Sequence, residues 1–441
     1  MAQAKAGWAE VEITPPVGLP MGGRGPDGPL GDTIIDSLYA QALIIEDAGG
    51  ERTLWIAFDL ISITHEDSVP LRFELSAATG IPMDAIILNC SHTHSGPGTC
   101  RGSHILELYL ANPKLGAYMA QLTGKVRLLA LQAASRMLPV EVAIYQGVSD
   151  VAINRRRPVG DNVKMAPNPD GHYNRDLWVL DLRGRSSGDR CVLFSYACHP
   201  VLVYRYARTS ISPDYPGKCR KHLRAQLGES VHCQFMQSVA GNVRPRQVAD
   251  LETGTFRNAT PEDVETVGKQ LANDIVTVLA GHGTTLELDL GFAEGWAALP
   301  RDQAAAAQTA HHYAQDENEK KHRFGKYWLD RIEHGPPLAT HTPWSIGLIR
   351  LTRKHVIVHL GGDSLAEWLP LIRRWLPAYE LFIWAYTQDF QGYLPTEELL
   401  DEGGYEVVRA PVMFKTGPGP LAAGLNNAMR RAIERLAKRA L

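Results

Sequence analysis

Two histidines, His92 and His94, stand in the segment Leu88–Gly98, which ends in Gly-Pro-Gly. The apolar run Ala85–Leu88 before them is typical of a buried strand, so the pair follows a strand end. Residues i and i+2 of an extended chain point the same way, so both imidazoles could face one cavity. Imidazole is a common metal ligand and a general acid or base near neutral pH. The plain alternative is a pair of turn histidines that only hydrogen-bond to the backbone.

Two more ligand-type residues have the same sequence context. His199 follows the apolar run Cys191–Ala197, and Asp363 follows the run His355–Leu360 and two glycines. Two imidazoles and one carboxylate with an open position make a catalytic zinc site. Zinc lowers the pKa of bound water and polarises a carbonyl, which suits amide or ester hydrolysis. The residues are too far apart in the sequence for a local motif such as His-Glu-x-x-His.

The apolar pattern predicts an α/β fold that positions these residues. Strands are expected at 6–14, 38–46, 53–61, 85–88, 140–147, 177–182, 191–197, 232–237, 285–292, 344–351, 355–360 and 381–386. Helices are expected at 70–79, 113–136, 261–280, 302–331 and 421–441, with two more ending near 227 and 375. The first strand stops at Pro15-Pro16, which predicts a sheet edge. Gly403–Glu406 is expected to lead a short strand.

No linker or internal repeat divides the chain, so we expect one continuous unit with a helical insertion near 300–340. The helix expected at 302–331 is rich in charge and contains three histidines. A charged helix face is usually a solvated face, and these histidines are expected to face solvent. They are His311, His312 and His322.

The composition is that of a globular protein, with 441 residues, 44% hydrophobic and 21% charged, and a net charge of -3. A basic excess is absent from the sequence, which argues against nucleic acid and against stable membrane association. The first ten residues contain no apolar core of a signal peptide, and no run of 18 apolar residues occurs. We therefore expect a cytoplasmic protein with a small-molecule substrate, and the sequence leaves a homo-oligomer open.

Six cysteines occur, and none forms a Cys-x-x-Cys pair. Reduced thiols are the expectation for a protein without an export signal. Cys90 and Cys100 flank the two histidines of the opening segment. A free buried thiol at Cys90 is favoured over a disulfide between them.

Several short blocks, taken together, resemble the neutral/alkaline (non-lysosomal) ceramidases along nearly the whole chain. The resemblance implies a mixed-sheet α/β catalytic domain with flanking helices, here a single domain over 1–441, and a zinc-dependent amidohydrolase. The blocks are Glu12–Gly18, His92–Gly98, Asn154-Arg155, Cys198–Pro200, Ser212–Tyr215, Gln237–Asn242, Gly362-Asp363, Gly392–Thr396 and Tyr405-Glu406.

The resemblance implies roles for individual residues. His92, His199, Asp363 and Tyr393 match the positions that hold the zinc ion. His94 matches a histidine that binds and polarises the scissile carbonyl, so the catalytic set is His92, His94 and Tyr393. Two further positions, Arg155 and Tyr405, match residues at the substrate end of the pocket.

The sequence departs from the family pattern at two of these blocks. Arg244 stands where the family has a serine with an assigned catalytic role, so a serine nucleophile is absent and metal-activated water is expected to attack. Asp363 stands where the family has Glu, which shortens the ligand arm by about 1.5 Å. The C-terminal immunoglobulin-like domain of the ceramidases is also expected to be missing.

Arginine gathers at the expected substrate positions, at Arg155–Arg157, Arg244 and Arg246. Its planar guanidinium binds carboxylate or phosphate through two parallel hydrogen bonds. We therefore expect Arg155, Arg244, Arg246 and Tyr405 to bind a small polar or anionic substrate rather than ceramide. The alternative is that these arginines pair with nearby Asp and Glu.

The function that the sequence favours is zinc-dependent hydrolysis of an amide bond. A second hypothesis keeps the metal site and makes the protein a carbohydrate- or acid-directed hydrolase or lyase, because a fold does not fix a reaction. A third is a non-catalytic metal- or ligand-binding homologue, which the replaced serine and the altered acidic ligand suggest.

Overall fold

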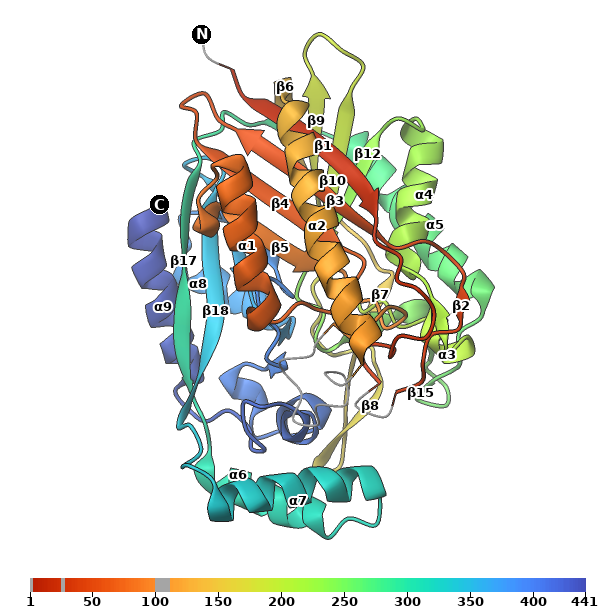
Figure 1. Cartoon of the computed structure of the whole chain (residues 1–441), viewed down its shortest axis with the longest axis vertical. Helices are drawn as coiled ribbons and strands as arrows, with labels where there is room; N and C mark the ends of the chain where they lie inside the picture. Colours follow the sequence, from red (N-terminus) through yellow and green to blue (C-terminus); the bar gives the residue numbers. More distant parts are fainter. Residues whose placement is uncertain (1–2, 25–27, 100–111) are drawn as a thin grey trace.

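The computed structural model describes residues 3–24, 28–99 and 112–441. Within these ranges the chain is a mixed α/β fold of several sheets with helices packed on them, as predicted (Figure 1). The Cys90 thiol is buried and free, while Cys100 lies outside the described residues. No helix in the described ranges has both the length and the apolar composition that crossing a membrane requires.

A nine-stranded mixed sheet forms the main layer of the fold. Neighbouring strands run antiparallel, except that β4 and β5 are parallel and β10 and β12 are parallel. A short strand, β16 (Thr284–Thr285), adds to β6. The order of the remaining strands is β12 (His232–Gln237), β10 (Arg190–Tyr196), β9 (Asp176–Gly184), β6 (Leu138–Val148), β1 (Lys5–Glu12), β3 (Tyr39–Glu46), β4 (Arg52–Phe58) and β5 (Ile86–Cys90).

The prediction that the first strand lies at a sheet edge is wrong. β1 pairs along its whole length with β3, and its first residues also pair with β6. The two prolines, Pro15 and Pro16, come after the strand has ended at Glu12. A proline prevents pairing only where its own missing N–H is needed, so these prolines end the strand without excluding neighbours.

A second sheet packs face to face on the main sheet. Its strands are β17 (Gly291–Pro300), β18 (His341–Arg350), β19 (His355–Leu360) and β21 (Glu380–Trp384), of which β19 and β21 are parallel. The two sheets meet in a cluster of large aromatic residues. Trp384 contacts Trp55 edge-on at 5.1 Å and stacks on Trp178 at 5.8 Å between ring centroids.

Helices cover the outer faces of both sheets (Figure 1). α1 (His65–Thr79) and α2 (Pro113–Ser135) lie on the main sheet near β1–β5, and α4 (Tyr215–Leu227) and α5 (Pro261–Leu279) lie near β10 and β12. α8 (Trp368–Trp375) and α9 (Leu425–Ala440) pack on the second sheet. The strands β5, β10, β12 and β19 are buried along almost their whole length, and burial of both faces explains why most of them are continuously apolar.

Three predicted elements differ from the structure. The strand predicted at 285–292 is not a single strand, because β16 ends at Thr285 and β17 begins only at Gly291. The helix predicted at 302–331 is a pair, α6 (Gln303–Ala314) and α7 (Glu319–His334). The break occurs where the Asn318 side chain accepts the Lys321 N–H and caps α7. The strand predicted from Gly403 is a helical turn, Tyr405–Arg409, because Gly404 adopts a φ of 87° and redirects the chain.

Strand ends of both sheets are joined by two buried amide side chains. Asn89 at the end of β5 donates to the carbonyls of Gln237 (3.1 Å) and Ala385 (2.7 Å) and accepts the Gln237 N–H at 2.8 Å. The Gln237 side chain donates to the carbonyls of Ser91 and Cys198, each at 2.9 Å. These bonds bring β5 and β12, the two ends of the main sheet's pairing order, together beside the end of β21.

Candidate metal centre and active site

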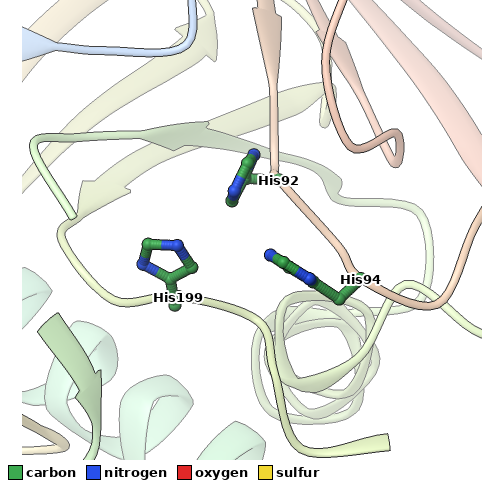
Figure 2. A group of neighbouring side chains, drawn as sticks. All are labelled: His92, His94 and His199. Carbon is green, nitrogen blue, oxygen red and sulfur yellow. The ribbon is translucent and has the colours of Figure 1, made fainter. Parts of the chain in front are cut away.

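Three histidines converge beyond the joined strand ends (Figure 2). His92 and His94 follow β5, and His199 follows β10. The ring of His92 lies 4.9 Å from His94 and 4.9 Å from His199, and His94 lies 5.8 Å from His199. One nitrogen from each ring lies within 4.8 Å of the others, so the group could hold a single metal ion.

Backbone carbonyls fix the orientation of two of these rings. His92 Nδ1 lies 2.7 Å from the Ile61 carbonyl oxygen, and His199 Nδ1 lies 2.6 Å from that of Ala240. A carbonyl can only accept, so each Nδ1 carries the proton and each Nε2 presents a lone pair. His92 and His199 therefore do hydrogen-bond to the backbone, as the plain alternative in the sequence analysis holds for turn histidines. The same bonds leave Nε2 of each ring available to a metal ion.

Asp363 places a carboxylate oxygen opposite both rings. Its Oδ2 lies 3.4 Å from His92 Nε2 and 3.5 Å from His199 Nε2. Among the described residues, neither this buried oxygen nor His199 Nε2 has a hydrogen-bond partner. Buried polar atoms are rarely left without one, so these two atoms indicate a missing ligand. The other oxygen, Oδ1, accepts a hydrogen bond from the Tyr386 hydroxyl.

The protonation states suit metal binding. Burial lowers the pKa of His199 to about 4, so its imidazole is neutral at neutral pH. Burial works to raise the pKa of Asp363, but the facing His199 and His92 outweigh it and hold that pKa well below its usual value. The site therefore offers neutral imidazole and ionised carboxylate, the forms that coordinate a cation.

A short parallel pairing sets Tyr393 beside Asp363. The strands β20 (Asp363–Ser364) and β22 (Tyr393–Leu394) pair so that these two residues are direct partners. Arg155 Nη2 donates to the Tyr393 hydroxyl at 3.2 Å. Burial raises the pKa of Tyr393 well above its ordinary value, so the phenol keeps its proton in this state of the protein.

Arg155 and Arg156 are paired with acidic residues, as the alternative interpretation of the arginines holds. Arg155 Nε donates to Glu406 at 2.9 Å, and Arg156 contacts Glu406 at 2.9 Å and Glu402 at 3.0 Å. Arg155 thus points one edge at a carboxylate and the other at Tyr393. Tyr405 packs edge-on against the Tyr393 ring at 5.5 Å.

The other two predicted arginines lie apart from each other. Arg244, on β13 (Val243–Pro245), directs Nη2 to the Tyr204 hydroxyl at 3.3 Å. Arg246 donates to the Tyr173 hydroxyl at 3.1 Å and lines a separate pocket with Asp150 and other residues. The structure therefore brings Arg244 to the neighbourhood of the histidines and does not bring Arg246 there.

A cavity of about 250 Å³ opens onto the histidines and Asp363. One part of its wall is apolar and aromatic, and two basic residues, Arg24 and Lys320, line another part. His199 is not among the residues that line the cavity. The lining residues are Gly23, Arg24, Ile61, His92, His94, Lys320, Asp363, Phe390, Tyr393, Tyr405, Met413 and Phe414.

Sequence reasoning missed several residues of this site. Tyr386 lies 4.5 Å from the His92 ring and has a φ of 55°, a strained value for a side chain of its size. It follows a buried strand directly, the same context that identified His199 and Asp363, and that signal could have found it. Lys320 could not have been found, because it lies on the helical insertion that was expected to be only a solvated surface.

No protein-family model matches the chain, and no curated protein is similar to it in sequence. Two ceramidases are among the solved structures that share its fold. The crystal structure of neutral ceramidase from Pseudomonas aeruginosa has a TM-score of 0.72 and 16% identity, covering 100% of this chain and 75% of that chain. A ceramidase complexed with C2 has a TM-score of 0.70 and 17% identity, covering 99% and 76%. The predicted ceramidase-like fold is thus confirmed.

Proposed function

We propose that this protein is a zinc-dependent hydrolase that cleaves an amide bond of a small polar or anionic substrate. The observation that carries the proposal is the convergence of two oriented imidazoles, through their Nε2 atoms, on one carboxylate oxygen of Asp363 that accepts no hydrogen bond from any described residue. The fold shared with two ceramidases supports amide hydrolysis as the reaction class.

The donor set fits a zinc ion. His92, His199 and Asp363 would hold it, with Tyr393 as the neighbouring fourth group. A bound zinc ion supplies Lewis acidity, which polarises a carbonyl and makes water a nucleophile near neutral pH. The Tyr386 hydroxyl, which donates to Asp363 Oδ1, fixes the carboxylate so that Oδ2 faces the two imidazoles.

The remaining residues act on the substrate. His94 lines the cavity, and its buried Nε2 has no hydrogen-bond partner among the described residues, so it can bind the carbonyl oxygen of the scissile bond. Burial lowers the pKa of His94 well below its ordinary value, which keeps the imidazole neutral. Arg155 orients the Tyr393 hydroxyl toward the same space, and that hydroxyl can donate to the developing oxyanion.

The size and charge of the cavity support a small substrate rather than ceramide. A volume of about 250 Å³ is at the low end for sites that enclose a small molecule. Basic residues line its wall, and Arg244 occupies the position where the resembled family has serine. A serine nucleophile is therefore not part of the proposal.

Metal analysis of purified protein tests the centre. We expect one zinc ion per chain in the wild type, and loss of that zinc in His92→Ala and His199→Ala. His311→Ala, on the exposed face of α6, is the matched control and should keep the metal. Stoichiometric zinc in both site variants would contradict the assignment.

Product analysis tests the reaction. Mass spectrometry of incubations with N-acyl amino acids and with uronate-containing sugars should detect the free amine and acid from the first group only. The activity should disappear in the two zinc-site variants and fall sharply in His94→Ala, which should keep its zinc. Cleavage of the sugars instead would favour the carbohydrate-directed alternative, and no turnover of either group would favour a binding protein.

A further inference from the structure

Three arginines surround one phenol at the edge of the metal centre. Tyr204, on the short helix α3 (Val203–Tyr206), lies 5.7 Å from the His94 ring. The guanidinium carbon of Arg24 sits 4.4 Å above the Tyr204 ring, and that of Arg205 lies 5.8 Å from it. Arg244 donates to the hydroxyl at 3.3 Å. We call these four residues the Tyr204 cluster.

Two members of the cluster lack a counter-charge. Among the described residues, no carboxylate lies within 4.0 Å of the side chain of Arg205 or Arg244. The Nε atom of Arg244 is also buried without a hydrogen-bond partner in that part of the chain. Arg155 and Arg156, by contrast, are matched by Glu406 and Glu402. A partly buried guanidinium with an unsatisfied donor is costly unless a ligand completes it.

The cluster is electrostatically positive. Burial lowers the pKa of Arg244, and repulsion from Arg155 and Arg205 adds to that effect. Burial works to raise the pKa of Tyr204, but Arg244, Arg205 and Arg24 outweigh it and lower that pKa below its ordinary value. The shift of Tyr204 reports a place where a negative charge is stabilised.

The cluster connects with the cavity through Arg24, which belongs to both. The same cavity is also lined by apolar side chains, from Ile61, Phe390, Met413 and Phe414. A ligand that contacts both the cluster and these side chains needs a short apolar part and an anionic end. The Arg244 guanidinium suits a carboxylate, because its Nε has no hydrogen-bond partner among the described residues and its Nη2 lies beside the Tyr204 hydroxyl.

We propose that the Tyr204 cluster binds a carboxylate of the substrate, so that the substrate class is N-acylated amino acids and similar amides that carry a carboxylate near the scissile bond. The reaction in this statement rests on the proposed hydrolase function. Binding of the carboxylate by the Tyr204 cluster does not depend on that function, and it can be measured without turnover.

The test compares two probes that contain no amide, 4-phenylbutyrate and the neutral alcohol 4-phenylbutan-1-ol. Isothermal titration of the full-length protein should show at least about tenfold tighter binding of the acid, the size of a charge-assisted hydrogen bond. Arg244→Gln should bring the two affinities to within about twofold, and Tyr204→Phe should reduce the preference by a smaller factor. Arg246→Gln, whose side chain lies in the other pocket, should keep it.

A zinc ion could also bind the carboxylate of the probe, and the variants distinguish binding by zinc from binding by the Tyr204 cluster. The preference for the acid should persist in His92→Ala and disappear in Arg244→Gln, with circular dichroism showing that each variant is folded. Equal affinities in the wild type, or a preference that survives in Arg244→Gln, would overturn the proposal. Failure to cleave any amide would instead contradict the proposed function and leave the binding result standing.

Discussion

Replacing Asn89 with alanine removes the side chain that joins β5 to β12 and to the end of β21. The lost bonds are those to Gln237 O (3.1 Å), Ala385 O (2.7 Å) and Gln237 N (2.8 Å). Gln237 O keeps the Ala385 N–H as a donor at 3.1 Å. Gln237 N and Ala385 O would keep no partner among the described residues. At about 1–3 kcal/mol for each buried group, the expected loss of stability is roughly 2–6 kcal/mol.

Calorimetry converts this loss into a melting temperature. An unfolding entropy of about 2.1 cal/mol/K per residue gives roughly 0.9 kcal/mol/K for a chain of this length, so each kcal/mol lowers the melting temperature by about 1 °C. We therefore expect Asn89→Ala to melt about 2–6 °C below the wild type. The affinity for the proposed zinc ion should fall about tenfold or more, because His92 stands only three positions after Asn89 and a displaced ligand binds poorly.

Gln226→Ala is the matched control, because it removes an amide hydrogen bond from an exposed helix position. Its melting temperature should stay within about 1 °C of the wild type. An Asn89→Ala protein that has the melting temperature of the wild type and binds zinc equally well would refute this prediction. The strand ends would then be held by packing alone.

Three further predictions follow from other parts of the site. A side chain at Gly23, where φ is 69°, would overlap the His94 ring. Gly23→Ala should therefore keep its zinc and lose at least about tenfold in kcat/KM. Unchanged kinetics would contradict the placement of His94. Glu406→Gln leaves Arg155 and Arg156 short of a buried counter-charge, which should cost about 3–5 kcal/mol and lower the calorimetric melting temperature by a similar number of degrees. Burial raises the pKa of Glu367 to about 7, so its contribution to stability is full below about pH 4.5 and is lost as the pH rises through 7. Glu367→Gln removes this loss, and its melting temperature should exceed that of the wild type by about 3 °C at pH 8 and not at pH 5.

Local patterns predicted the parts of the site that depend on local structure. His92, His199 and Asp363 each follow a short, continuously apolar run, and such runs are strands because both of their faces are buried. A residue just beyond a strand end lies near other strand ends, so the convergence of these three was accessible from the sequence. Tyr393 follows no such run, and only the resemblance to the ceramidases pointed to it.

The features that were missed depend on long-range pairing and on side-chain direction. The place of β1 inside the main sheet is set by partners at 39–46 and 138–139, which its own residues do not specify. Arg244 and Arg246 are only two positions apart in the sequence, but Arg244 contacts Tyr204 and Arg246 lines a separate pocket. Pro245 ends β13 between them, and a helical turn begins at Arg246. The Lys320 side chain reaches the cavity from α7, and the local charge pattern could not show this.

The pairing of Asp363 with Tyr393 across β20 and β22 has a consequence for how the protein is made. Its proposed metal ligands begin at His92 and end about 300 residues later, and the joined strand ends that orient them come from residues 86–90, 232–237 and 380–384. A growing polypeptide that has emerged only as far as β12 contains His92 and His199 but neither Asp363 nor Tyr393. Contacts of such long sequence separation form slowly. Under the proposed function, metal binding would therefore require completion of the whole fold, and fragments released early in synthesis would lack two of the proposed ligands.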